Sequence, residues 1–299
     1  MLLPGILLGL LYLTALLAAL LATGSPWRRC AAVLVVATSL PLAFFVPAEY
    51  PTFTAFLALG CLWFTARVVE LARERGSVPA LYRLWHAVGM VDTRRARRRV
   101  PKVDRSALAR MAVGAPLLGA AWAGVYFGSQ LLSGAPRLAV RWLCGVVFMY
   151  VAVEVTVSAV ILVYGLLGID PRPLHDDPIL SKSIGEFWNR RWNRAVHRFL
   201  KQNVFAPVAR LGHAEWGMVL AFLLSAFIHF YFMWPAVGAF WAGMMALFFL
   251  LQLPLLWLER VLGVTRWPAP VARAWTLTLL VLLSPLFVEP VLRIVDTWG

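Results

Sequence analysis

Two ionisable side chains lie inside long apolar runs, where charge is costly. Glu154 stands within VFMYVAVEVTVSAVILVYG and His229 within MVLAFLLSAFIHFYFMW. Such residues often do chemistry in a bilayer. Ser225 and Ala226 precede His229 by four and three residues, so a helix would leave a hollow beside the imidazole. A neutral imidazole there suits a general base near pH 7. A histidine or a carboxyl group bonded to a neighbouring helix fits as well.

A second candidate for chemistry is the segment EFWNRRWNRAVHRFLK, residues 186–201. Plotted as one α-helix at 100° per residue, it has three faces. They are an aromatic face with Trp188 and Trp192, a cationic face with Arg190, Arg191, Arg194, Arg198 and Lys201, and a narrow stripe of Asn189, Asn193 and His197. This pattern predicts an amphipathic helix at the membrane interface. A role as a simple membrane anchor explains the aromatic and cationic faces. It does not explain the stripe of Asn189, Asn193 and His197, because amide groups at the apolar border do not strengthen membrane binding.

The composition of the chain indicates which kind of secondary structure holds these residues in place. The chain has 299 residues, of which 61% are hydrophobic and only 14% charged, and its mean hydropathy is +0.77. Apolar runs near 20 residues recur along its length, which predicts an all-α, polytopic integral membrane protein in one domain, 1–299. We expect eight transmembrane helices, at about 2–23, 30–46, 52–66, 111–132, 138–167, 215–234, 236–258 and 272–292, with the first retained and not cleaved as a signal.

The net charge of +14 follows from basic loops, so nucleic acid is not the expected partner. Most Lys and Arg residues fall in four segments, 24–29, 67–110, 168–214 and 259–271. With eight spans these segments share one side of the membrane. The positive-inside rule makes that side the cytoplasm and places both termini outside. We expect a bacterial inner membrane protein.

The remaining polar and sulfur-containing groups suggest no further chemistry. The three cysteines, Cys30, Cys61 and Cys144, are isolated in or beside apolar runs, so we predict no disulfide, metal site or cofactor. The basic run RRARRR (94–99) predicts a loop facing lipid headgroups. His175 in PLHDD lies in an unpatterned, proline-rich loop and is expected to face solvent.

Two motifs together resemble a known family. SIGEFWNRRWN (183–193) is followed by SAFIH (225–229), and His229 comes 36 residues after Asn193. This pair is similar to the wax-synthase branch of the membrane-bound O-acyltransferase family. The resemblance covers about residues 181–233, and LYRLWHAVG (81–89) is a weaker family segment. Asn189 departs from the pattern, because wax-synthase relatives often carry glycine there.

The resemblance implies that His229 is the catalytic histidine and Asn193 its partner. The expected reaction moves a fatty acyl group from acyl-CoA to the hydroxyl of a lipophilic alcohol and forms a wax-type ester without a covalent acyl-enzyme. The expected substrate-binding residues are Trp188, Asn189, Arg190, Arg191, Trp192, Arg194, His197, Arg198 and Ser225, with the arginines facing the CoA phosphates. His229 would lie about 20 Å from the cytoplasmic end of its span, so a water-accessible channel must reach it.

Several alternatives stay open at this point. A transporter could use Glu154 and His229 as a proton relay. A non-catalytic scaffold for lipid enzymes would need neither residue. Among acyltransferases, the acceptor could instead be a sterol, a small hydroxylated metabolite or a glycan. The acyl-chain length and the oligomeric state are equally open.

Overall fold

The computed structural model describes residues 2–74, 78–90, 96–171 and 173–296. Within them nearly all regular structure is helical, which confirms the predicted all-α class. The chain divides into two compact units, one of Met1–Arg97 with Tyr231–Ala242 and one of Arg98–Phe230 with Gly243–Gly299. Arg94 and Arg95 of the basic run lie outside the described residues.

Helix length and hydropathy give a count of spans that differs from eight. Among the described residues, six helices are long and apolar enough to cross a membrane, or up to seven if a bent pair counts as one span. That pair, α12 (Ala269–Leu283) and α13 (Pro285–Val295), bends by 49° where one span at 272–292 was expected.

The expected sixth and seventh spans fall in one 49-residue stretch, Ala214–Leu262. It comprises α10 (Ala214–Leu250) and α11 (Gln252–Leu262). Gly238 interrupts α10 with φ 83° and ψ 166°, a backbone conformation that glycine adopts readily and other residues rarely adopt. Pro235 lies three residues before it. The predicted break therefore exists, but it lies inside a helix that continues on both sides of it.

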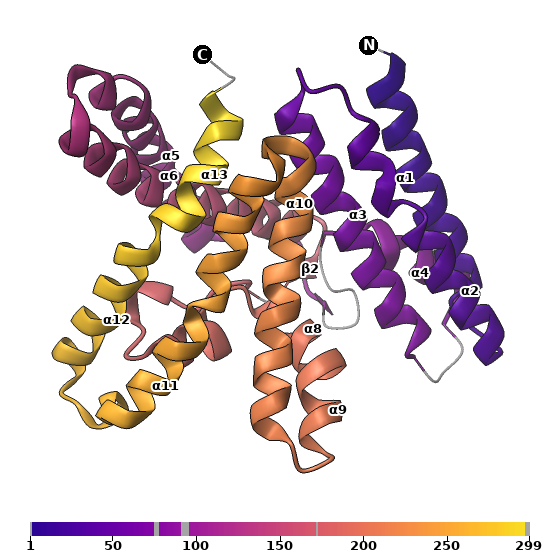
Figure 1. The fold of residues 1–299 in the computed structure, drawn as a ribbon. Coiled ribbons are helices and arrows are strands. Elements are labelled where there is room, and N and C mark those ends of the chain that lie inside the picture. The colour runs from indigo at the N-terminus through magenta and orange to yellow at the C-terminus, as the bar shows by residue number, and fades with distance from the viewer. Residues whose placement is uncertain (1, 75–77, 91–95, 172, 297–299) are drawn as a thin grey trace. The chain divides into compact units, whose positions relative to one another are not determined.

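The first unit contains α1 (Leu2–Leu21), α2 (Pro26–Ala37), η1 (Leu40–Phe45), α3 (Pro51–Ala72) and α4 (Ala80–Val88). Figure 1 shows α1, α2 and α3 packed together. Small residues let these helices approach closely. Ala15, Ala18 and Ala19 are fully buried on α1, and a Cβ on Gly60 of α3 would lie 3.0 Å from Leu11 Cδ2.

Polar contacts attach α4, which contains residues 81–88 of the weaker family segment, to α3. Glu70 pairs with Arg67 at 3.1 Å and with Nε2 of the buried His86 at 3.3 Å. The Arg67 guanidinium also lies 4.3 Å from the ring centroid of Trp63. These contacts join α3 and α4 inside the first unit.

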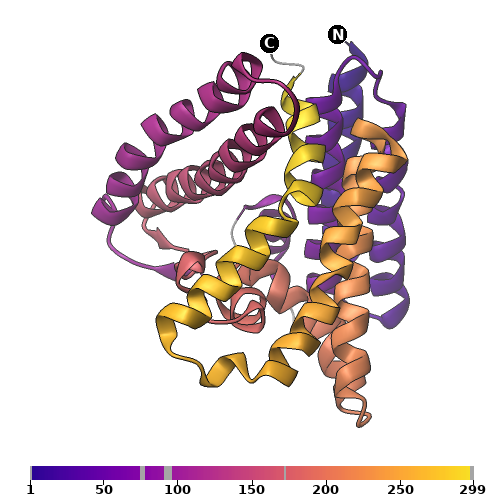
Figure 2. The same cartoon turned by 60° about the vertical axis from the view of Figure 1, so that its left-hand side comes forward.

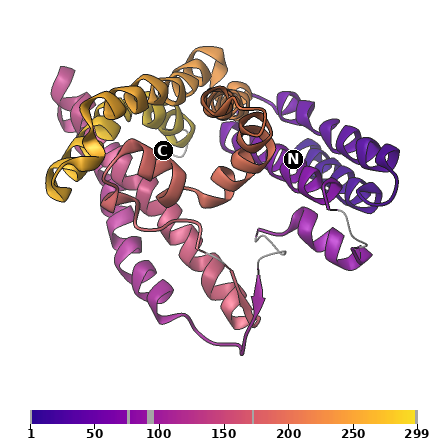
Figure 3. The same ribbon diagram turned by 90° about the horizontal axis from the view of Figure 1, so that it is seen from below.

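The second unit contains a long helical hairpin, α5 (Arg105–Tyr126) and α6 (Gly134–Leu166), with η2 (Gly128–Leu131) between them. Figures 2 and 3 show α5 and α6 side by side. Glycine permits this approach, since a Cβ on Gly114 would lie 2.7 Å from Val155 Cγ2. Helix α13 packs on α6, where Arg141 pairs with Glu289 at 2.9 Å and with Asp296 at 2.8 Å.

The basic segment 168–214 forms a series of short helices. They are η3 (Pro178–Leu180), α7 (Ile184–Glu186), η4 (Phe187–Arg191), α8 (Arg194–Leu200), η5 (Lys201–Phe205) and α9 (Ala206–Ala209). One more short helix, η6 (Val264–Arg266), lies outside this segment and follows α11. Before them, strand β2 (Ile169–Asp170) pairs with β1 (Arg97–Arg98). The segment then packs tightly on the start of α10, because a Cβ on Gly217 would lie 2.9 Å from the Phe205 carbonyl oxygen.

Candidate active site

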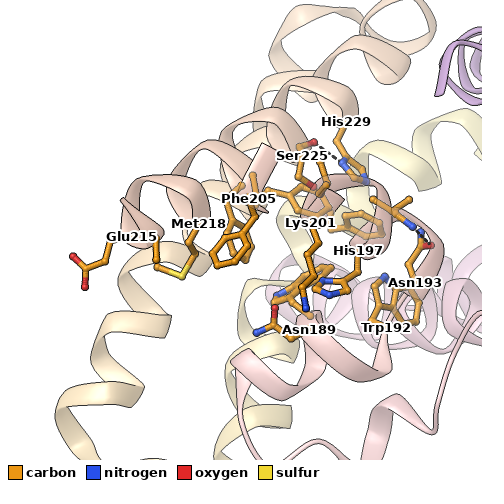
Figure 4. A pocket seen from close by; sticks show the side chains of 18 of the residues that line it. Asn189, Trp192, Asn193, His197, Lys201, Phe205, Glu215, Met218, Ser225 and His229 are labelled. Carbon is orange, nitrogen blue, oxygen red and sulfur yellow. Dashed lines mark hydrogen bonds between the residues drawn. The ribbon is translucent and has the colours of Figure 1, made fainter. Parts of the chain in front are cut away.

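One face of α10 lines a cavity of about 510 Å³ in the second unit. The lining residues on this helix include Glu215, Met218, Phe222, Ser225 and His229, spaced three or four apart as a single helical face requires. The row from Glu215 to His229 is about 21 Å long. Figure 4 shows four of them, Glu215, Met218, Ser225 and His229, along this helix. The cavity therefore extends from the start of α10 to the depth of the histidine.

The facing wall comes from the segment that carries the first motif. It is lined by Trp188, Asn189, Trp192, Asn193, Val196, His197, Leu200, Lys201 and Phe205. The predicted stripe of Asn189, Asn193 and His197 therefore shares one cavity with Ser225 and His229 (Figure 4).

The predicted amphipathic helix over 186–201 is wrong as one continuous helix. A π-helical turn, η4, ends at Arg191, and Trp192 is extended with ψ 136°. Asn193 then has φ 37° and ψ 61°, and α8 begins at Arg194. The lining positions still recur on both sides of this break, which is why the polar stripe survives although its helix does not.

Local hydrogen bonds explain where this break falls. The backbone N–H of Trp192 donates to the Phe187 carbonyl at 2.8 Å and closes the π turn. The Asn193 side-chain oxygen accepts from the Val196 N–H at 3.3 Å and caps α8. Asparagine tolerates the left-handed conformation better than most residues and is among the best N-caps. The residue type at 193 thus suits the backbone as well as the cavity.

Two acidic side chains fix the start of the segment. The Ser183 hydroxyl accepts from the Glu186 N–H at 2.9 Å, and the Glu186 carboxylate accepts from the Lys182 N–H at 2.9 Å. Buried Glu259 on α11 accepts from the backbone N–H of Ile184 at 2.8 Å. Hydrogen bonds within residues 182–186 and from α11 thereby fix the start of the first motif.

His175 does not face solvent as the sequence suggested. Its side chain is only 9% exposed, its ring centroid lies 4.4 Å from that of Trp192, and Nδ1 accepts a hydrogen bond from the Asn193 backbone N–H at 3.1 Å. Burial lowers the pKa of His175 to about 4, so the imidazole is neutral at pH 7. The PLHDD loop is therefore part of the structure behind the cavity wall.

His229 is held in the tautomer that a general base needs. Its Nδ1 lies 2.7 Å from the Ser225 carbonyl oxygen, an acceptor only, so Nδ1 carries the proton and Nε2 the basic lone pair. The ring stacks on Phe249 with a centroid separation of 3.8 Å and an interplanar angle of 27°. A backbone bond and an aromatic contact together fix the orientation of the imidazole.

Asn193 and His197 contribute different polar groups to the facing wall. Because the Asn193 oxygen already caps α8, its amide N–H groups are the donors that it can offer to a ligand. Burial, followed by the positive charges of Lys201 and Arg198, lowers the pKa of His197, which favours its neutral form. The wall thus offers an amide donor and a second neutral imidazole.

Trp188 is fixed by a polar partner that the sequence analysis missed. Its indole N–H donates to Gln252 Oε1 at 3.0 Å, and the fully buried Gln252 donates to the Phe248 carbonyl at 2.9 Å. The Trp188 ring also contacts Phe249 with centroids 5.5 Å apart. Gln252 stands in the apolar run FFLLQLPLL, where a polar side chain is costly, and this was the signal that could have found it.

The cations in the lining are not those expected from sequence. Among the described residues, the lining includes Lys201 and Arg260 but none of Arg190, Arg191, Arg194 and Arg198. Arg191 pairs with Glu186 at 2.7 Å and donates to the Asp176 carbonyl, while the largely exposed Arg190 lies 3.8 Å from Asp176. Arg260 comes from α11 and pairs with Glu215 at 3.2 Å, a proximity for which the sequence holds no local signal.

Glu154 is the other ionisable group expected inside the membrane. It lies on α6, and the described residues that line the cavity do not include it. The cavity therefore brings His229 together with Asn193 and His197. The acidic side chain among its described lining residues is Glu215, about 21 Å from His229 along α10, and not Glu154.

Comparison with known proteins identifies the segment that builds this cavity. Residues 171–251 match the membrane bound O-acyl transferase family. This segment is therefore similar to that family, and the match covers about a quarter of the chain. It contains His175, Asn193 and His229, so the family match covers both cavity walls described above. The resemblance expected from the two motifs is confirmed.

Individual relatives point to the same branch. Two Arabidopsis thaliana proteins, probable long-chain-alcohol O-fatty-acyltransferases 7 and 2, are 29% and 36% identical over 44% and 43% of this chain. A long-chain-alcohol O-fatty-acyltransferase from Simmondsia chinensis is 32% identical over 27% of the chain. The matches span 43%, 41% and 25% of those relatives' own lengths. The similarity thus supports the wax-synthase branch of the O-acyltransferase family.

Proposed function

We propose that this protein is an O-acyltransferase that moves a fatty acyl group from acyl-CoA to the hydroxyl of a lipophilic alcohol. One observation carries the proposal, namely that His229 and Asn193 line a single cavity that extends to the start of α10. The names of the relatives, long-chain-alcohol O-fatty-acyltransferases, support the alcohol as acceptor. A sterol, a small metabolite or a glycan as acceptor is tested by the assay below.

The reaction uses His229 as a general base. Nε2 takes the hydroxyl proton of the alcohol while the alcohol oxygen attacks the thioester carbonyl carbon. The carbonyl oxygen becomes an oxyanion and accepts a hydrogen bond from the Asn193 amide. When the carbon–sulfur bond breaks, the CoA thiolate takes the proton from His229, which leaves the ester, free CoA and the neutral histidine. The balance of protons requires no other co-reactant.

The two substrates enter a cavity of mixed character. Trp188, Phe222 and Phe249 provide apolar surface for the acyl chain, and Lys201 and Arg260 provide positive charge for the CoA phosphates. Both cations lie in segments that the positive-inside rule assigns to the cytoplasm, 168–214 and 259–271. We therefore propose that acyl-CoA enters from the cytoplasm. The placement of both termini outside, which requires eight spans, and the bacterial inner membrane stay predictions.

Purified protein and labelled acyl-CoA test the proposal. With a panel of a long-chain alcohol, a sterol, a small hydroxylated metabolite and a glycan, we expect label in the long-chain ester. His229→Ala should lower kcat by about 10²- to 10⁴-fold, as loss of a general base does. His213→Ala is the matched control, because this exposed histidine precedes the same helix and makes no side-chain cap.

Two results would contradict the proposal. One is that no alcohol of the panel receives label from the wild-type protein. The other is transfer by His229→Ala at the wild-type rate. Proton flux in proteoliposomes without any transfer would instead favour the transporter.

A further inference from the structure

Three hydrogen bonds connect the loop at 174–176 to the helix break at 191–194. The backbone N–H of Asp176 donates to the Arg191 carbonyl at 2.9 Å, and the backbone N–H of Arg194 donates to the Leu174 carbonyl at 2.9 Å. Between them, His175 Nδ1 accepts from the Asn193 N–H at 3.1 Å. The two backbone bonds flank the break, and the histidine bonds its central residue.

The histidine contact is specific to one tautomer. Since the Asn193 amide can only donate, Nδ1 must carry a lone pair and the proton must sit on Nε2. That Nε2 is buried and has no hydrogen-bond partner among the residues that the structure describes. Leaving a buried donor unpaired is unfavourable, so the position is poorly explained by stability alone.

The break that His175 holds determines where two cavity side chains point. Asn193 has a left-handed backbone, unusual for any residue but glycine, and both Trp192 and Asn193 line the cavity. His175 contacts both, through the Asn193 N–H and through the Trp192 ring. The histidine itself is not among the described lining residues. It can therefore act on a substrate only by way of its neighbours.

We infer that His175 is a positioning residue for acyl transfer: by accepting the Asn193 N–H and packing on Trp192, it aims the Asn193 amide at the oxyanion. The inference rests on the function proposed above. It assigns no proton transfer to His175 and no contact with substrate. Geometry matters strongly here, since a misplacement of about 1 Å can cost about 10²-fold in rate.

His175→Leu and His175→Asn separate this role from a general loss of structure. Asparagine can place its side-chain oxygen near the position of Nδ1 and keep an acceptor, whereas leucine keeps volume and removes the acceptor. We expect His175→Leu to lower kcat at least tenfold with the KM for acyl-CoA within about twofold of wild type. His175→Asn should recover most of the lost kcat.

A double-mutant cycle with Asn193→Asp gives the decisive measurement. This variant lacks the amide donor but keeps an oxygen that can cap α8, so it should remain folded. If His175 acts through the Asn193 amide, His175→Leu should lower kcat much less in the Asn193→Asp background than in wild type. A merely structural histidine would lower kcat by the same factor in both backgrounds.

Each outcome bears on the inference in a defined way. The inference would be overturned if His175→Leu lowered kcat by the same factor in both backgrounds, or did not lower kcat at all. The proposed function would still stand in that case if transfer depended on His229. Absence of transfer by the wild-type protein would overturn both. If His175→Leu does not fold, a low kcat in folded His175→Asn, judged by an unchanged Tm, would also overturn it.

Discussion

Asn193→Asp isolates the proposed oxyanion donor from the other roles of this residue. In the structure the Asn193 oxygen caps α8 by accepting the Val196 N–H at 3.3 Å, and the backbone is left-handed with φ 37°. Aspartate keeps the oxygen and tolerates the same backbone conformation, but its carboxylate has no N–H to donate. The substitution therefore removes one hydrogen bond from the transition state and leaves the helix cap in place.

The expected size of the effect follows from that single bond. Loss of one oxyanion donor typically lowers kcat by about 10²- to 10³-fold, or about 2.7 to 4 kcal/mol. The negative charge of aspartate adds repulsion toward the oxyanion, so we expect a loss of at least this size. The free energy of unfolding should change little, because Asp and Asn are similar N-caps.

Asn193→Ala is the comparison variant. It loses the amide donor as well, so its kcat should fall by a similar factor. It also loses the cap, at about 1 kcal/mol, and places a side chain without polar groups in the left-handed region, at about 1 to 2 kcal/mol. Label transfer from acyl-CoA gives kcat, and thermal unfolding in detergent gives Tm. Asn193→Asp with wild-type kcat, or with a Tm as low as that of Asn193→Ala, would refute the reasoning.

Three further predictions use other contacts. Burial lowers the pKa of His175 from 6.5 to about 4, so as pH falls below 6.5 the unfolded chain binds a proton that the folded chain does not. About 3 kcal/mol of stability should be lost by pH 4, and the fall in Tm should be smaller in His175→Asn. Lys201→Gln should raise the KM for acyl-CoA with little change in kcat. Arg190 is outside the described lining, so a raised KM in Arg190→Gln would instead favour the arginines expected from sequence as the residues that bind the CoA phosphates. Gln252→Leu should lower stability by about 1 to 3 kcal/mol, because the Trp188 N–H loses its acceptor, and a Tm equal to wild type would contradict this.

Features that depend on local periodicity could be predicted from the sequence. Apolar runs of helical length predict membrane helices because a bilayer excludes unpaired backbone groups. The spacing of Ser225 and His229 already placed them on one face of a helix, and Ser225 proved to hold the His229 ring through its carbonyl oxygen. The stripe of Asn189, Asn193 and His197 likewise faces the cavity, even though the helix assumed for it is broken.

Contacts between distant segments decided the rest. Besides its local hydrogen bonds, the break at Trp192 and Asn193 is joined by hydrogen bonds to residues 174–176, which a helical wheel of residues 186–201 cannot contain. Arg191 was expected at the CoA phosphates, but Glu186 and the carbonyl oxygen of Asp176 bind its guanidinium instead. Arg260 reaches the cavity only because α11 returns beside the start of α10.

The sequence by itself therefore determined the helical membrane class, the family motifs and the candidate pair of Asn193 and His229. Hydrophobic periodicity and short motifs carry this information, because both are set by residues within a few turns of one another. Only the tertiary structure decided which cations line the cavity and that His175 lies behind its wall. Ion pairs and buried hydrogen bonds form between side chains far apart in the chain, so their partners follow from packing and not from spacing.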